Sequence, residues 1–105
     1  MRLRLTKPAQ HDFDQAVEWF ESQRPWLADR FLDEIGEAFE QIAKTPEQFP
    51  RVEVEVAKSS RDWRRIILKR FSYIIVYFIA GDTVVVCTVS HTSRDWTSRL
   101  TDKEE

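Results

Sequence analysis

Hydrophobic residues in the first part of the chain recur at helical spacing. A short alternating strand is predicted over residues 2–5, after which Thr6 offers a side-chain oxygen for a helix N-cap and Pro8 fits the first turn. The following apolar positions lie at intervals of three, one and three, on one face of a helix: Phe13, Ala16, Val17 and Phe20. The helix is predicted to break over residues 22–25.

A second amphipathic helix is predicted over residues 25–44, and Thr45–Pro46 ends it. Its apolar residues recur every three or four positions: Ala28, Phe31, Leu32, Ile35, Ala38, Phe39 and Ile42. Gly36 weakens a helix by about 1 kcal/mol relative to alanine, so we expect close packing there. The four-residue break between the helices predicts an antiparallel helical hairpin.

After residue 50 the hydrophobic period changes to two, which is typical of strands. Strands are predicted over residues 52–56, 63–69, 73–80 and 83–90, and Gly81–Asp82 forms a two-residue hairpin turn between the last two. Within 63–69, Ile66 and Leu68 share one face, and Arg65, Ile67 and Lys69 share the other. The fold class is therefore α+β: an N-terminal strand and an antiparallel two-helix hairpin packed on a mainly antiparallel sheet of about four to five strands.

The turn at Gly81–Asp82 also predicts the register of the hairpin. Counting outward, Tyr77 faces Val86, Ile75 faces Thr88, and Tyr73 faces Ser90. We assign the wholly apolar face to the core beneath the helices: Ile74, Val76, Phe78, Val85, Cys87 and Val89.

The other face of the hairpin is too apolar to remain in water. Either a partner protein docks on it, or the C-terminal segment around Trp96 and Leu100 folds back and covers it. The residues that would form the partner interface are Ile75, Tyr77, Ile79, Val84 and Val86.

Length and charge place the chain among small globular proteins. Its 105 residues fit one domain, predicted over 1–100 with a polar tail over 101–105. The net charge of -2 hides an asymmetry, because residues 1–50 carry 6 basic and 10 acidic side chains, whereas residues 51–105 carry 10 and 8. The basic stretch 61–70 is either a phosphate-binding footprint or, as we favour, a solubilised strand edge.

Several classes of protein and site are excluded. No apolar run approaches the roughly 20 residues of a membrane-spanning helix, and no signal peptide is present, so we expect a cytoplasmic protein. The lone Cys87 excludes an internal disulfide and fits a small buried residue. No nucleotide-binding loop or HExxH motif occurs, so we expect neither a metal nor a cofactor.

One end of the predicted sheet gathers the residues that could carry chemistry. The register places His91, Arg94, Tyr73 and Arg70 there, and Arg65 can join from the neighbouring strand. Arginines can hold an RNA backbone and stabilise a pentavalent phosphate, while a histidine or tyrosine moves the proton of a 2'-hydroxyl. The alternative is that the histidine only packs or caps a strand end and that the tyrosines are interface residues.

Five segments in this order resemble the RelE/ParE superfamily of bacterial toxins, particularly the plasmid-stabilisation, ParE-like type. They are residues 16–20, 30–35, 45–52, 65–77 and 89–95, and the likeness covers residues 2–96. The resemblance implies the toxin of a type II toxin–antitoxin system, which a cognate antitoxin neutralises by wrapping its surface.

The resemblance implies one of two targets. RelE-like members cut messenger RNA on the ribosome as metal-independent endoribonucleases, whereas ParE-like members act on DNA gyrase without being hydrolases. Residues 65–77 and 91–94 are closer to ParE, and the chain lacks the dense lysine cluster and the tyrosine after the last strand of the ribonuclease pattern. Gyrase is therefore slightly favoured, and a non-toxic binding module of the same fold is the alternative.

Residue by residue, the resemblance implies two groups for either target. The catalytic candidates are Arg65, Tyr73, His91 and Arg94. The candidates for binding the target or a nucleic acid are Arg64, Lys69 and Arg70.

Overall fold

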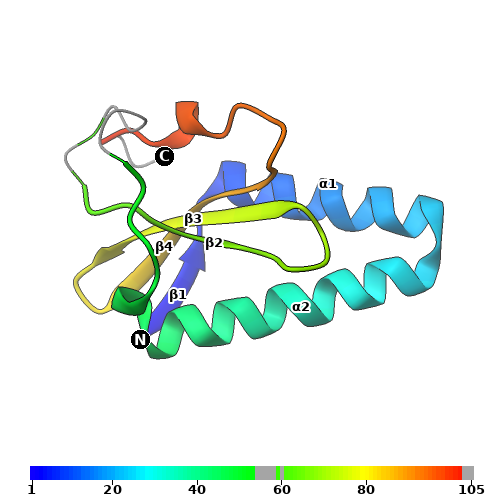
Figure 1. Cartoon of the computed structure of the whole chain (residues 1–105), viewed down its shortest axis with the longest axis horizontal. Coiled ribbons are helices and arrows are strands. Elements are labelled where there is room, and N and C mark those ends of the chain that lie inside the picture. The colour runs from blue at the N-terminus through cyan, green and yellow to red at the C-terminus, as the bar shows by residue number, and fades with distance from the viewer. Residues whose placement is uncertain (54–58, 60, 103–105) are drawn as a thin grey trace.

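A four-stranded mixed sheet forms the centre of the structure, a computed structural model that describes residues 1–53, 59 and 61–102 (Figure 1). The strands are β1 (Arg2–Leu5), β2 (Arg64–Ile67), β3 (Tyr73–Ala80) and β4 (Thr83–His91), in the spatial order β1-β4-β3-β2. Strand β1 runs parallel to β4, and the other pairs are antiparallel. The predicted α+β class and the mainly antiparallel sheet are confirmed.

Two long helices form an antiparallel hairpin whose turn lies far from both chain ends (Figure 1). Helix α1 (Lys7–Gln23) begins as predicted, because the Thr6 hydroxyl oxygen accepts the Ala9 N–H at 3.3 Å. Helix α2 (Pro25–Lys44) follows after a single extended residue, Arg24, whose N–H closes the last turn of α1 on the Phe20 carbonyl. The break is therefore shorter than the predicted four residues.

The main hydrophobic core lies between the helices and the sheet. Phe20 and Phe31 bring the two helices onto Tyr73, with ring centroids 5.9 and 5.1 Å from its ring. Tyr77 is fully buried there, and its hydroxyl donates to the Pro46 carbonyl; this burial raises the pKa of Tyr77 to about 12. The sheet residues of this core are Leu68, Ile75, Tyr77, Val84, Val86 and Val89.

The two faces of the β3–β4 hairpin are therefore assigned the wrong way round in the sequence-based prediction. Ile75, Tyr77, Val84 and Val86, expected at a partner interface, are fully buried beneath the helices, and Ile79 is half-buried near the turn. Both faces are apolar, so alternation alone cannot distinguish them. The position of β1 decides the matter, as only Thr6 separates it from α1 and its inward side chains share the face of Val84 and Val86.

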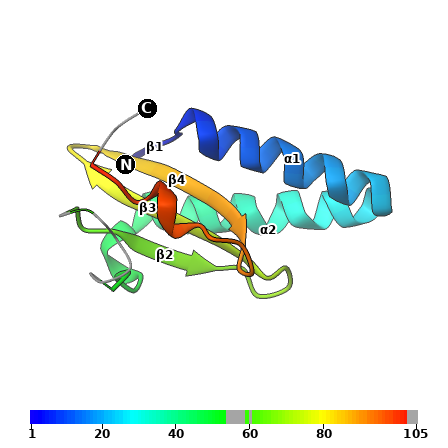
Figure 2. The same cartoon turned by 90° about the horizontal axis from the view of Figure 1, so that it is seen from above.

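A second, smaller core covers the opposite face of the sheet. It packs Val52, Trp63 and Leu100 against the sheet residues Ile74, Val76, Phe78, Val85 and Cys87, and Trp96 borders it. The C-terminal segment, with a short 3-10 helix η2 (Thr97–Arg99), lies over this face (Figures 1 and 2). The C-terminal segment around Trp96 and Leu100 therefore does fold back onto the sheet, but it does not cover the face predicted for it. It covers the face predicted for the main core, and of the residues assigned to that core only Val89 lies beneath the helices.

Two arginines fasten the C-terminal segment. The Arg99 guanidinium donates two hydrogen bonds, of 2.7 and 3.0 Å, to the Asp12 carboxylate of α1. The Arg61 guanidinium donates to the carbonyls of Thr101 and Asp102 at 3.2 and 2.8 Å, so the start of the predicted tail is held in place. Residues 103–105 lie outside the described residues.

A β-bulge changes the predicted register halfway along the hairpin. Tyr77 faces Val86 as predicted, but Val76 faces Thr88, so Cys87 is an extra residue on β4. The predicted pairs Ile75–Thr88 and Tyr73–Ser90 are wrong, because every later residue of β4 is displaced by one. Tyr73 instead faces His91.

Strand β2 forms one edge of the sheet. Ile66 and Leu68 share one face as predicted, and that face lies toward the helices, whereas Ile67 on the other face is 47% exposed. The Arg65 N–H points away from β3 and donates to the Pro50 carbonyl at 3.0 Å. Of the strand predicted over 52–56, only its start is described, where the Val52 N–H donates to the Trp63 carbonyl; Val54 and Val56 lie outside the described residues.

Gly36 does not pack closely against a neighbour, contrary to the prediction, since a Cβ built there meets no atom within 4 Å. Gly36→Ala should therefore raise the free energy of unfolding by about 1 kcal/mol through helix propensity alone. Gly81→Ala should lower it by about 1 kcal/mol, because Gly81 has a φ of +63°. Chemical denaturation of both variants checks the pair, and a destabilised Gly36→Ala protein would contradict the open space around that position.

Candidate functional site

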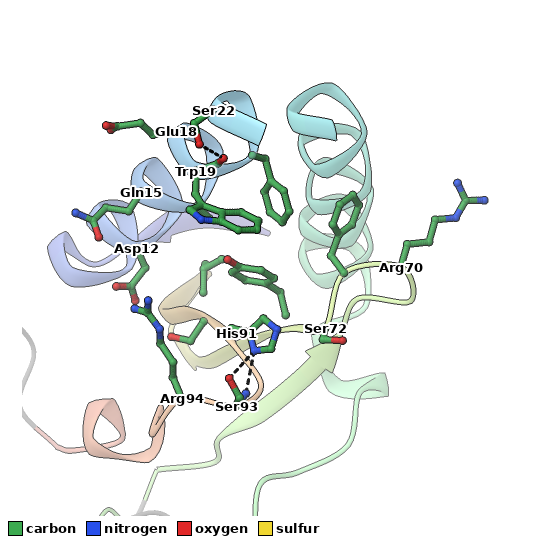
Figure 3. A pocket seen from close by; sticks show the side chains of 16 residues that line it. Asp12, Gln15, Glu18, Trp19, Ser22, Arg70, Ser72, His91, Ser93 and Arg94 are labelled. Carbon is green, nitrogen blue, oxygen red and sulfur yellow. Dashed lines mark hydrogen bonds between the residues drawn. The ribbon is translucent and has the colours of Figure 1, made fainter. Parts of the chain in front are cut away.

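A pocket of about 840 Å³ opens between α1, the β2–β3 turn and the end of β4 (Figure 3). It brings together four of the predicted site residues, namely Arg70, Tyr73, His91 and Arg94. The full lining is Asp12, Gln15, Ala16, Glu18, Trp19, Phe20, Ser22, Arg70, Phe71, Ser72, Tyr73, Val89, Ser90, His91, Ser93 and Arg94. We call it the Tyr73 pocket.

Tyr73 and His91 meet because of the bulge at Cys87. Their rings are edge to face, with centroids 5.5 Å apart and planes at 79°. Tyr73 is also held by Phe20 and Phe31 of the main core, so the folded helices fix its position. Tyr73 is thus packed against the main core, while His91 at the rim of the pocket is exposed.

The contacts of His91 select its tautomer. The Ser93 backbone N–H donates to Nδ1 at 3.1 Å, and the Ser93 hydroxyl oxygen lies 2.7 Å from the same nitrogen. A backbone N–H can only donate, so Nδ1 accepts and the proton of the neutral ring sits on Nε2. His91 therefore offers a hydrogen-bond donor at Nε2, and it would have to release Ser93 before Nε2 could act as a base.

Tyr73 is likewise a donor at neutral pH. Burial raises the pKa of its hydroxyl above the ordinary value of 10; the Arg94 guanidinium opposes this rise, and the Asp12 carboxylate adds to it. The phenol therefore stays protonated near pH 7. Neither Tyr73 nor His91 is poised to take a proton from a hydroxyl group.

Arg94 contributes a cation to the pocket. Its side chain extends toward Asp12 (Figure 3), whose two carboxylate oxygens are already taken by Arg99. Within residues 1–53, 59 and 61–102, no acidic group forms an ion pair with Arg94. The group of Asp12, Arg94 and Arg99 therefore carries one net positive charge.

Asp12, Arg99 and Trp19 also belong to this region, and none of them is among the site residues predicted from the sequence. The Asp12–Arg99 pair joins α1 to a segment near the end of the chain, and no local pattern indicates a contact of that range. Trp19 gives a clearer signal, as a large aromatic residue outside the apolar stripe of its helix, and it is 56% exposed.

The other predicted site residues lie elsewhere. Arg65 pairs with Val76 on the face of the second core and does not line the Tyr73 pocket, so the expectation that it joins His91 is wrong. Arg64 has a structural role. Its side chain is only 11% exposed, donates hydrogen bonds to the Glu47 and Phe49 carbonyls at 2.8 Å, and forms an ion pair with Asp62. Lys69 is exposed on the β2–β3 turn, beside a different groove.

That groove, of about 670 Å³, lies between α2 and the edge strand β2. Glu34 lines it; one carboxylate oxygen accepts the Arg70 N–H at 3.0 Å, and the other is buried without a hydrogen-bond partner in the described part of the chain. The remaining lining residues are Arg30, Asp33, Glu37, Ala38, Gln41, Phe49, Ile66, Ile67, Leu68, Lys69 and Arg70. We call it the α2–β2 groove.

Neither a metal cluster nor a membrane span is found where the structure can be described. Its described residues contain no group of three or more histidine, cysteine, aspartate or glutamate side chains placed to hold a metal ion. None of the helices in this part is long and apolar enough to cross a membrane.

Comparison with known proteins gives a consistent result. The family model described as the ParE toxin of the type II toxin–antitoxin system parDE matches residues 3–96. Among solved structures, a chain of the "Chromosomal ParDE TA system from P. aeruginosa" is similar with a TM-score of 0.70 and 19% sequence identity, covering 87% of this chain and 95% of that one. No curated protein sequence matches the chain.

The arrangement of charges around Tyr73 predicts its titration. Because the chain has two tyrosines, ultraviolet absorbance of the Tyr77→Phe variant reports Tyr73 alone. We expect its pKa to exceed 10 and to rise further when Arg94→Gln removes the nearby cation. Arg65→Gln, on the opposite face, is the matched control and should leave the titration unchanged. An Arg94→Gln variant with an unaltered Tyr73 titration would contradict the described placement of Arg94.

Proposed function

We propose that this chain, which belongs to the ParE toxin family of type II toxin–antitoxin systems, arrests bacterial growth by binding DNA gyrase and is neutralised by a cognate antitoxin. The observation that carries the proposal is the family match over residues 3–96, which spans both helices and the whole sheet. The toxin–antitoxin assignment inferred from the five sequence segments is thereby confirmed, and the target is our inference.

The chemistry of the Tyr73 pocket supports a binding mode of action over RNA cleavage. Cleavage through a 2'-hydroxyl needs a group that accepts its proton. The neutral tautomer of His91 presents a donor, the Tyr73 phenol stays protonated, and Arg65 lies on the other face of the sheet. The pocket offers donors and a cation, which suit binding.

Expression and purified components test the target. Expressed alone, the chain should prevent colony formation, and co-expression of the small neighbouring gene should restore growth. With purified gyrase and plasmid, we expect broken plasmid to accumulate. Intact plasmid together with cut, translated messenger RNA that His91→Ala suppresses would overturn the gyrase target in favour of the ribosome. Normal growth at a verified soluble level would instead indicate a non-toxic binding module.

We place the antitoxin-binding surface at the α2–β2 groove, because most of the sheet residues predicted for the partner interface are buried beneath the helices. Alternation along β2 directs the Ile67 N–H away from β3, toward the open edge of the sheet, and the Ile67 side chain is exposed. An extended antitoxin segment can add to this edge by backbone hydrogen bonds. A basic side chain of that segment can pair with the Glu34 carboxylate, which lines the groove and has one oxygen without a hydrogen-bond partner in the described part of the chain.

Two substitutions test this surface in a binding titration with the antitoxin. Ile67→Asp and Glu34→Gln should each weaken binding more than tenfold, since one introduces a charge at the edge and the other removes a buried charge partner. Leu32→Asp is the matched control, because Leu32 is similarly exposed at 40% but lies on α2 outside the groove. Equal losses for Ile67→Asp and Leu32→Asp would contradict the proposed surface.

A further inference from the structure

We propose that the Tyr73 pocket binds one unpaired nucleotide of a single-stranded nucleic acid, with the base between Trp19 and His91 and the phosphate on Arg94. This inference goes beyond the binding of gyrase and does not depend on it. It rests on the aromatic walls, the uncompensated cation and the donors of a pocket that the fold itself builds.

The walls of the pocket suit a flat aromatic ligand. Trp19 comes from α1 and His91 from β4, and they lie on opposite walls (Figure 3). Trp19 touches Phe20 edge to face, with centroids 5.1 Å apart and planes at 77°, and its side chain remains 56% exposed. Base stacking on such rings tolerates any base, because every base has an aromatic face.

The charge of the pocket suits one phosphate. Asp12 is held by Arg99 in a two-bond ion pair, which leaves the Arg94 charge uncompensated. The Glu18 carboxylate points away from the pocket (Figure 3). Arg70 lines the pocket from the β2–β3 turn, but its guanidinium points away from Trp19 and His91 (Figure 3), so the phosphate is assigned to Arg94.

The donors complete the match. The Nε2–H of His91 and the Tyr73 hydroxyl can donate to oxygen or ring-nitrogen acceptors, and a protonated phenol beside a cation does not repel a phosphate. A concave pocket of this kind is reached by a base that has left its stack, so double-stranded nucleic acid is not the ligand. At about 840 Å³ the pocket lies within the usual size range of small-molecule sites.

The test measures fluorescence anisotropy of a labelled hexamer of deoxyadenosine against a hexamer of abasic units with the same phosphates. We expect the abasic strand to bind at least tenfold more weakly, since stacking is lost while charge is kept. A labelled RNA hexamer is the third arm, and tighter binding of it supports the proposal with RNA as the source of the nucleotide. No gyrase is present in this assay, so the nucleotide-binding proposal and the gyrase proposal can each be disproved independently of the other.

Matched variants locate the binding. Trp19→Ala should weaken deoxyadenosine binding about tenfold, and Trp19→Phe should restore part of it. Trp26→Ala is the control, since Trp26 is 53% exposed on α2 beneath the Arg30 guanidinium and outside the pocket. Arg94→Gln should reduce the slope of log affinity against log salt by about 0.7, whereas Arg65→Gln should not.

Three results would overturn the proposal. One is equal binding of the abasic and deoxyadenosine strands, which would leave charge alone as the cause. Another is an equal loss of affinity for the deoxyadenosine hexamer in Trp19→Ala and Trp26→Ala, with both variants shown to be folded by circular dichroism. The last is the absence of binding by every strand up to about 1 mM, an affinity too weak for a built site.

Discussion

The parallel pairing of β1 with β4 is the contact on which the other layers depend. It places the first residues of the chain beside residues 83–86, and only Thr6 then separates β1 from the first helix. The helices must therefore cover the face of the sheet that β1 directs them to, and the C-terminal segment takes the face that remains. The positions of both cores, and of the pocket at the end of the hairpin, depend on which face of the sheet the helices cover.

The sequence predicts the parts of the fold that local patterns encode. The helical period, the Thr6 cap and the Gly81–Asp82 turn gave the fold class, the extent of α2 and the register near the turn. Local patterns do not encode which face of the sheet the helices cover or where the bulge lies. Both faces of β3 and β4 are apolar enough to be buried, so alternation does not show which one the helices cover. A count that assumes regular pairing also cannot detect the extra residue at Cys87.

The candidate site shows the same division. Counting outward from the turn placed Tyr73 within one residue of its true neighbour, so the sequence located the right end of the sheet. The bulge then put His91 in the position expected for Ser90. The Asp12–Arg99 pair needed the whole fold, because it connects α1 to the C-terminal segment. The hydrogen-bond contacts of His91 also lie outside what a sequence pattern encodes, and they make this group a set of donors around a cation where the sequence predicted a proton-transferring group.

The distance in sequence between the partners of β1 has a consequence for synthesis of the protein. Because Arg2 pairs with Thr83, the first strand has no partner until residues 83–86 have been translated. The helical hairpin can form early, since its contacts are local, but the sheet that shapes the Tyr73 pocket cannot close before β4 leaves the ribosome. The first strand therefore stays unpaired while the helices form, and the pocket takes shape only after β4 has emerged.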